Sequence, residues 1–389
     1  MGEATGSRRG PGLWILALVI LGLLVVGFWV RGVPGGDGPP FSTFGWKTNF
    51  EKHTIPYSEV LSGGPPKDGI PSVDNPSFVS AEEANAWLRD SEPVVSVLIN
   101  GEAKAYPLQI LTWHEIVNDA VAGVPVSVTF CPLCNSAIAF DRRLEGQVLD
   151  FGTTGKLRRS DLIMYDRQTE TWWQQLTGEA IVGDLVGLNL KMLPAPLIGY
   201  GQFKEAYPDG LVLSRETGHS RSYGQNPYAG YDDINSSPFL FRGPIDGRLP
   251  AMERVVAVSL DGKDRTYPFS VLEKVMVVND RIGSRDVAVF HVPGASSALD
   301  RRSIADSRDV GATGVFDRHL EGDLLEFFAE DGKIRDRKTG SVWDIVGRAV
   351  EGPLQGKTLE PLVHQNHFAF AWLAFKPEAE VYLPEETPL

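Results

Sequence analysis

The stretch Val94–Val121, VVSVLINGEAKAYPLQILTWHEIVNDAV, occurs a second time as Val255–Ile282, VVAVSLDGKDRTYPFSVLEKVMVVNDRI. Both copies contain Tyr-Pro and Val-Asn-Asp at the same spacing. Matched positions continue downstream through an FDR element to the tryptophans Trp173 and Trp343. A repeat of this length indicates that one structural unit is built twice. Residues found in both copies are then explained by the fold, and residues found in only one copy become the candidates for chemistry.

Short apolar runs separated by glycine and proline dominate both copies. Runs rich in Val, Ile and Phe, bounded by turn residues, are typical of strands. The sequence therefore predicts an α+β, β-rich fold of two homologous halves from an internal duplication, after an N-terminal transmembrane helix. The predicted strands include Val94–Ile99, Val124–Phe130, Val148–Phe151, Val255–Leu260 and Val287–Phe290.

Two stretches of the first copy favour helices. From about Leu108 to Asn118 the apolar residues follow helical spacing, so that four side chains share one face. These side chains are Ile110, Trp113, His114 and Val117. A capping box at Ser80-Ala-Glu-Glu83 predicts a second helix that runs to about Leu88.

The N-terminal residues predict a membrane anchor. Residues 13–30 form an uncharged run of 18 residues, long enough to span a bilayer. Arg8 and Arg9 precede this run and favour a cytoplasmic N-terminus, with the bulk of the chain on the extracytoplasmic side of the cell membrane. A cleaved signal peptide is the alternative. The predicted divisions are an anchor at 1–30, a Gly/Pro stalk at 31–45, a first half at 46–213, a connecting segment at 214–254 and a second half at 255–389.

Charge and motifs exclude several classes of ligand. The net charge is −13 and no basic tract follows the anchor, so nucleic acid is not expected as a partner. Gly152–Lys156 resembles a phosphate loop, but Asp150 stands where such a loop needs glycine, and we read the stretch as a turn. Asn135 stands where a haem-attachment motif needs histidine. Neither haem nor nucleotide is therefore expected as a cofactor.

Long signatures of this chain resemble a known family. GIPSVDNPSF (69–78), YPLQILTWHEIVND (106–119) and VTFCPLCNSAIAFDR (128–142) are similar to the prokaryotic family called domain of unknown function three-one-seven-nine. The resemblance extends over nearly all of the chain after the stalk. It implies an extracytoplasmic protein and supplies no activity and no catalytic residues.

The only two cysteines, Cys131 and Cys134, lie in CPLCNSA of the first copy, where the second copy has VPGASSA. Two thiols at this spacing can chelate a soft metal ion or cycle to a local disulfide. They can also form a fixed disulfide that stiffens the turn. The sequence thus leaves three functions open: a metal-binding protein, a thiol–disulfide oxidoreductase, and a non-catalytic scaffold.

Two further residues of the first copy extend the metal hypothesis. His114 stands where the second copy has Val275, and Met164 belongs to a stretch absent from the second copy. With Cys131 and Cys134 they would form a sulfur-rich set with one imidazole, which suits copper, with zinc as the other candidate. We therefore predict a soft transition-metal site at Cys131, Cys134, His114 and Met164. Further candidate ligands are His53, His364 and His367.

Overall fold

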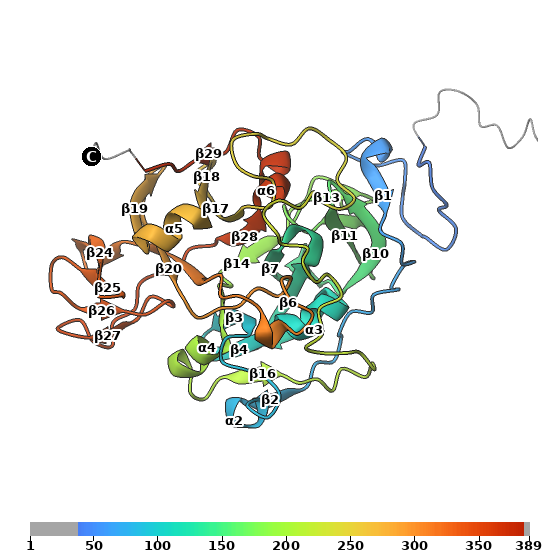
Figure 1. Ribbon diagram of the computed structural model, residues 1–389. Helices are drawn as coiled ribbons and strands as arrows, with labels where there is room; N and C mark the ends of the chain where they lie inside the picture. The colour runs from blue at the N-terminus through green and yellow to red at the C-terminus, as the bar shows by residue number, and fades with distance from the viewer. Residues whose placement is uncertain (1–37, 385–389) are drawn as a thin grey trace, which may run out of the picture. The chain divides into compact units, whose positions relative to one another are not determined.

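A computed structural model describes residues 38–384 (Figure 1), and most of its regular structure is β-strand. The anchor predicted at residues 13–30 lies outside this range. Within the range, no helix combines the length and apolar character needed to cross a membrane. The β-rich α+β class predicted from the sequence is confirmed for the described residues.

The first half contains mainly short strands. In chain order its elements are η1 (Tyr57–Glu59), β1 (Val60–Ser62), β2 (Phe78–Ser80), α2 (Ala81–Ala84), β3 (Pro93–Ile99), β4 (Glu102–Pro107), α3 (Leu108–His114), β5 (Ile116–Val121), β6 (Val124–Cys131), η2 (Pro132–Cys134), β7 (Ser136–Asp141), β8 (Arg143–Leu144), β9 (Gln147–Val148), β10 (Phe151–Arg158), β11 (Asp161–Asp166), β12 (Trp172–Gln174), β13 (Ala180–Val182), β14 (Lys191–Leu193), β15 (Leu197–Gly199), α4 (Tyr200–Ala206) and β16 (Leu211–Leu213).

The second half follows the connecting segment. Its elements are β17 (Arg254–Leu260), β18 (Lys263–Pro268), α5 (Phe269–Val275), β19 (Val277–Ile282), β20 (Arg285–Val292), η3 (Ile304–Asp306), β21 (Ala312–Asp317), β22 (His319–Leu320), β23 (Asp323–Leu324), β24 (Phe327–Glu330), β25 (Lys333–Asp336), β26 (Val342–Trp343), β27 (Ala349–Glu351), β28 (Gln365–Phe368), α6 (Ala369–Phe375) and β29 (Glu380–Val381).

The sheets of the two halves have corresponding strand orders. The order β15-β3-β4-β16 of the first half corresponds to β28-β17-β18-β29 of the second, and in both sheets the last of these pairs is parallel. The β5-β6-β7 meander corresponds to β19-β20-β21, and β10-β11-β12-β13 corresponds to β24-β25-β26-β27. The order of elements along the chain therefore recurs together with the sequence.

Residues shared by the two copies make the same hydrogen bonds in both halves. Tyr106 donates to Asp119 at 2.7 Å, and Tyr267 donates to Asp280 at 2.8 Å. The matched side chains thus have structural roles, as the comparison of the copies predicts. Two more bonds recur in this way: Trp173 to Asp166 and Trp343 to Asp336, and Asn118 to the Phe151 carbonyl and Asn279 to the Phe327 carbonyl.

The helix predicted to reach Asn118 is shorter than expected. It ends at His114, because Glu115 adopts a positive φ of 58°, and β5 begins at Ile116. Val117 consequently belongs to a strand and not to the helical face assigned from its spacing. The other predicted helix is also short: α2 covers Ala81–Ala84 instead of reaching Leu88. Its Ser80/Glu83 capping box is present as predicted.

One predicted strand and one predicted turn are wrong in the region of β9 and β10. The run Val148–Phe151 is divided, since β9 ends at Val148 and β10 begins at Phe151. Residues 152–156 form part of β10 and not a turn, with a bulge between Thr153 and Lys156. Gly155 has a φ of 68° there, and a Cβ would lie 2.0 Å from the Pro65 carbonyl oxygen. Only glycine fits this close approach.

The two halves share one core. From Thr43 onward the chain forms a single unit, in which β28 of the second half packs beside β7 of the first (Figure 1). The largest buried apolar cluster includes Phe130 and Phe140 from the first half and Phe368 and Trp372 from the second. Burial of such aromatic side chains contributes a large part of the stability of a domain.

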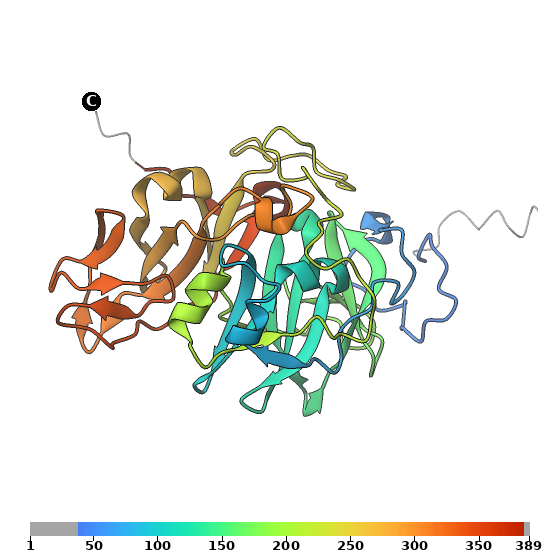
Figure 2. The ribbon, with the colours of Figure 1, turned by 60° about the horizontal axis from the view of Figure 1, so that its bottom comes forward.

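The connecting segment, residues 214–254, lies on the surface and is fixed to the second half. In Figure 2 it runs above the strands of the first half and reaches the 300–310 insert. The amide of Asn226 donates to the Arg302 carbonyl at 2.7 Å, and that of Gly230 donates to the Asp300 carbonyl at 2.6 Å. The insert that only the second copy contains therefore anchors the segment between the two halves.

Candidate functional site

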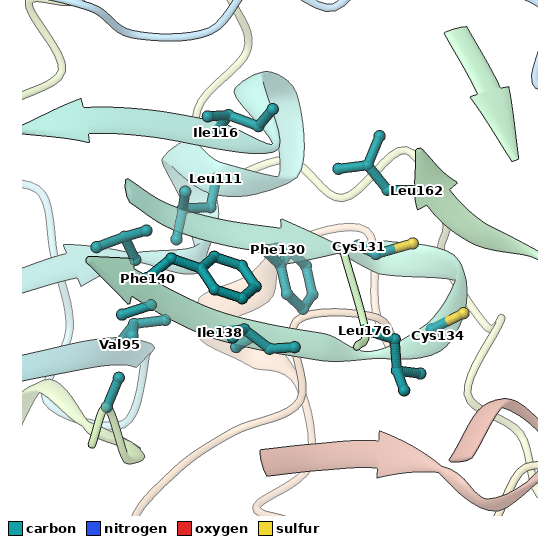
Figure 3. Packing of buried hydrophobic residues seen from close by; sticks show 14 of the residues in the cluster. Val95, Leu111, Ile116, Phe130, Cys131, Cys134, Ile138, Phe140, Leu162 and Leu176 are labelled. Carbon is teal, nitrogen blue, oxygen red and sulfur yellow. The ribbon is translucent and has the colours of Figure 1, made fainter. Parts of the chain in front are cut away.

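Both cysteines lie in the connection between β6 and β7. Cys131 ends β6, and Pro132–Cys134 form a single 3-10 turn before Asn135 reverses the chain in the left-handed conformation, with a φ of 51°. Both sulfurs lie on the same side of the hairpin, flanked by Leu162 and Leu176 (Figure 3). Both cysteines are free thiols and at most 1% exposed.

A third ligand group, the carboxylate of Asp161, lies beside the two thiols. One potential ligand atom from each of Cys131, Cys134 and Asp161 lies within 4.8 Å of the other two, and all three residues are buried. Oδ2 of Asp161 accepts hydrogen bonds from Gln174 Nε2 at 2.6 Å and from the Leu176 amide at 3.0 Å. Oδ1 is buried without a hydrogen-bond partner among the described residues. One carboxylate oxygen therefore remains free for a ligand bond.

The β10–β11 hairpin carries Asp161 to the cysteines. Its tip is formed by Arg159 and Ser160, whose φ values are 52° and 70°. A left-handed residue other than glycine costs roughly 1–2 kcal/mol, so neighbouring contacts must hold this tip. Ser160 Oγ donates to the Phe239 carbonyl at 2.5 Å, and Arg159 donates to the Ala374 carbonyl. The corresponding hairpin of the second half, β24–β25, has shorter strands.

A second buried carboxyl group, that of Glu115, belongs to the same group of acids. Burial raises the pKa of Glu115 to about 8, and the nearby charge of Asp161 raises it further. Burial also raises the pKa of Asp161 to about 7, although the Gln174 and Leu176 hydrogen bonds oppose this shift. The structure gives the Glu115 carboxyl no hydrogen-bond partner among residues 38–384. Its backbone is fixed, because the Phe130 amide donates to its carbonyl at 2.8 Å.

Neither thiol is in an environment that stabilises the thiolate. Burial raises the pKa of Cys131 and raises that of Cys134 more strongly, and the charge of Asp161 adds to both shifts. Within the described residues, neither Asp161 nor Glu115 forms an ion pair with arginine or lysine. Cys131, Cys134 and Asp161 thus form a cluster without a cation from the described part of the chain, and Glu115 lies outside that cluster but interacts electrostatically with Asp161 and Cys131. A bound divalent cation would supply the missing positive charge and displace their protons.

Two tyrosines of the connecting segment cover the site. Tyr231 donates to the Leu133 carbonyl at 3.0 Å and accepts a hydrogen bond from the Phe239 amide at 3.1 Å. Burial raises the pKa of Tyr231, and the charges of Cys134 and Cys131 add to this shift. The pKa of Tyr228 is raised in the same way, with contributions from Glu115 and Cys131. The connecting segment therefore limits access of solvent to the thiols.

His114 is buried, and both of its ring nitrogens have hydrogen-bond partners. Nδ1 lies 2.7 Å from the Pro71 carbonyl oxygen, and Nε2 lies 2.7 Å from the Tyr223 hydroxyl. Burial lowers its pKa to about 4, so the ring is neutral at physiological pH. His114 is not a member of the cluster formed by Cys131, Cys134 and Asp161. The positive φ of Glu115 explains why adjacent residues reach different surroundings.

Met164 is fully buried on β11, three residues after Asp161. Successive side chains of a strand point to opposite faces, and residues 161–166 of β11 are consecutive in the strand, because the extra residues of the bulge lie on β10. Met164 and Asp161 therefore lie on opposite faces of the strand. In the sheet Met164 pairs with Thr153 and Trp173, within the apolar core of the first half.

The remaining histidines form local contacts elsewhere. His364 Nδ1 lies 3.1 Å from the Leu362 carbonyl oxygen, and His367 Nε2 lies 2.8 Å from Gln365 Oε1. His53 Nδ1 lies 2.9 Å from the Ile55 carbonyl oxygen. The structure thus brings together two of the residues predicted as ligands, Cys131 and Cys134, without adding any of these histidines to their cluster.

Sequence reasoning missed the two acids, Asp161 and Glu115, although the repeats contained the signal for both. Asp161 lies in the stretch 158–164, which the second copy lacks, and Glu115 stands opposite Met276. Both residues are specific to the first copy. Within the stretch 158–164, the soft thioether of Met164 matched the predicted copper site better than the hard carboxylate of Asp161, so Asp161 was not predicted as a ligand.

Comparison with known proteins identifies the family. The chain belongs to the family described as protein of unknown function, DUF3179, whose pattern matches residues 67–379. No curated protein and no solved structure shows a significant match. The matched region includes the cysteines, both buried acids and the connecting segment that covers them.

Proposed function

We propose that the protein binds one divalent transition-metal ion through Cys131, Cys134 and Asp161. The observation that carries this proposal is a buried set of three donor atoms within 4.8 Å of one another, without a cation from the protein. Bonds of about 2.0–2.3 Å to a tetrahedral ion place neighbouring ligand atoms roughly 3.5 Å apart. Binding would therefore draw the three donor atoms, which lie within 4.8 Å of one another, closer together.

The donor set favours zinc over copper. Two thiolates and a carboxylate form a mixed soft and hard set, which suits the borderline ion Zn²⁺. Copper(I) is favoured by sulfur and imidazole donors. His114 and Met164 would have made the site softer, but His114 is hydrogen-bonded elsewhere and Met164 faces the opposite side of β11. Zinc therefore replaces copper as our first candidate.

Glu115 is proposed as the fourth protein group at this site. Its carboxyl is buried, has no hydrogen-bond partner among the described residues, and interacts with the charges of Asp161 and Cys131. It would bind the ion directly or accept a proton from a water molecule on it. A closed site with four protein ligands is structural, whereas an open position permits chemistry.

The other two functions suggested by the cysteines have less support. A thiol–disulfide oxidoreductase needs a stabilised thiolate, whereas burial raises the pKa of both Cys131 and Cys134. A fixed disulfide has no support from the structure, which contains both residues as free thiols. The acids beside the thiols favour a metal ion over both alternatives.

We further propose that the two halves arose by internal duplication and that only the first retains the site. The corresponding strand orders and the recurring hydrogen bonds support this origin. In this proposal the domain lies outside the cytoplasm, behind the membrane anchor expected at residues 13–30. The second half stabilises the segment that covers the metal.

Elemental analysis of the full chain, purified without chelators, tests the proposed function. After incubation with zinc and removal of free ions, we expect about one zinc per chain. A Cys131→Ser/Cys134→Ser variant should contain none, and Asp161→Asn should lose most of it. Competition between zinc and copper on the same preparation would test the preference for zinc.

Two variants separate the structure-based ligands from the sequence-based ones. Met164 lies on the same strand as Asp161 but is not a proposed ligand, so Met164→Leu should retain zinc. His114→Gln should retain zinc for the same reason. Thermal melting of each variant shows whether it is folded. Loss of metal from folded His114→Gln with retention in folded Asp161→Asn would overturn the proposed ligand set. Absence of metal from the wild-type chain after reconstitution would overturn the function itself.

A further inference from the structure

A cleft lined by residues of both halves and of the connecting segment contains features of a second binding site. It has a volume of about 550 Å³ and lies between the η1 turn, the tip of the β10–β11 hairpin, the connecting segment and α6. This volume is within the usual range for sites that bind small organic molecules. Its polar lining includes Glu59, Arg159, Arg242 and Asp246.

The cleft lining contains two arginines and two carboxylates, and both carboxylates are already paired. Glu59 is the one carboxylate shared by Arg158, at 2.8 Å, and Arg159, at 3.3 Å. Arg158 also interacts with the charge of Glu179, so Arg159 is the arginine that depends on its longer contact with Glu59. Arg159 also donates to the Ala374 carbonyl, which holds its guanidinium in place at the cleft.

Arg242 supplies a further positive charge. Its side chain lines the cleft, and the described part of the chain provides it with neither a carboxylate nor a hydrogen-bond acceptor. The nearby Asp246 does not serve this purpose, because its carboxylate pairs with Arg248 at 2.7 Å. Of the four charged side chains that line the cleft, Arg242 is therefore the one that no described residue pairs with.

The rest of the lining is largely apolar. Ile245 is 47% exposed, and Phe241 and Leu61 are half-buried. Leu373 and Pro377 complete this part of the wall. Apolar side chains beside the unpaired guanidinium group of Arg242 suit a ligand that has a hydrocarbon part and an anionic group.

We propose that this cleft binds an amphiphilic organic anion. Its carboxylate or phosphate group would pair with Arg242 and Arg159, and its hydrocarbon part would pack against Phe241, Ile245 and Leu61. Guanidinium groups bind both kinds of anion through paired hydrogen bonds. The site is separate from the cysteines, so it does not depend on the proposed metal function.

Isothermal titration calorimetry on the full chain tests the proposal with four probes of known chemistry. Hexanoate and hexyl phosphate contain both parts of the ligand, hexanol lacks the charge, and inorganic phosphate lacks the hydrocarbon. We expect saturable binding of hexanoate or hexyl phosphate at low ionic strength. Hexanol and inorganic phosphate should each bind at least about tenfold more weakly, because each loses one of the two interactions.

Variants assign the binding to this cleft. Arg242→Glu should weaken binding of the charged amphiphile at least about tenfold, whereas Arg221→Glu, an exposed arginine outside the cleft, should have no effect. Ile245→Ser should weaken binding of hexyl phosphate without changing that of inorganic phosphate. Equal affinity for hexanol, equal affinity for inorganic phosphate, unchanged binding in Arg242→Glu, or no saturable binding would each overturn the proposal.

Discussion

At the scale of single residues, burial of His367 makes stability depend on pH. The ring is fully buried, donates from Nε2 to Gln365 at 2.8 Å and stacks on Trp372 with centroids 5.5 Å apart. Burial lowers its pKa to about 3, whereas an unfolded chain has a histidine pKa of about 6.5. Below pH 6.5 the unfolded state therefore binds the proton more readily. The stability from this group is complete above that pH and is lost as the pH falls toward 3.

The predicted loss from His367 is about 1.4 kcal/mol for each pH unit below 6.5. Urea unfolding of the wild type and of His367→Gln between pH 7.5 and 5 would measure it. The variant has a lower free energy of unfolding at pH 7.5, but its stability should fall less steeply with acidification. Equal slopes in wild type and His367→Gln would contradict the prediction.

At the scale of elements, each helix of the repeated stretch is followed by a residue in the same left-handed backbone conformation. Glu115 follows α3 with a φ of 58°, and Met276 follows α5 with a φ of 60°. In both places the carbonyl accepts a hydrogen bond at 2.8 Å from the second strand that follows, from the amide of Phe130 on β6 and from that of His291 on β20. A left-handed residue with a side chain costs roughly 1–2 kcal/mol. The conformation is therefore maintained by the strand pairing that follows.

Replacing Met276 by glycine should stabilise the protein. Glycine adopts a positive φ without the steric cost, and Met276 is only half-buried, so that little packing is lost. We expect the free energy of unfolding in urea to rise by about 1 kcal/mol. Lys274→Gly is the matched control, because it lies within α5 and should lower stability by about 1 kcal/mol. If both changes destabilise equally, the backbone of Met276 is not strained.

Glu115 at the end of α3 shows where prediction from the sequence reaches its limit. Most predicted strands were confirmed, since their apolar runs and turn residues are local signals. The end of α3 was not predicted, because Glu115 is neither glycine nor asparagine and the buried residues of β5 continue the apolar pattern. Cys131 and Cys134 could be identified as a pair from their spacing. Asp161 follows Cys134 by 27 residues and reaches it only through a hairpin whose tip is held by distant carbonyls.

At the scale of the whole molecule, the second half supports the cover over the site of the first. Asp232, next to Tyr231 in the connecting segment, is fully buried and pairs with Arg254 at 2.7 Å and Arg308 at 2.8 Å. Burial alone would raise the pKa of Asp232, but the two arginines hold it below the usual value. Ser297 of the second half also donates to this carboxylate. Arg308 belongs to the 300–310 insert that only the second copy contains, so a residue specific to the second half has a positioning role.

Weakening this support should make the cysteines more accessible. Arg308→Gln removes one charged contact to Asp232, whose buried carboxylate keeps its pair with Arg254. A hydrogen bond to a charged group contributes about 1.5–3 kcal/mol, so opening of the segment should become at least about tenfold more frequent. The rate at which a thiol reagent labels the chelator-treated protein should increase by that factor. Arg301→Gln changes an exposed arginine of the same insert and should leave the rate unchanged. Equal labelling rates in the two variants would show that the second half does not control access to the thiols.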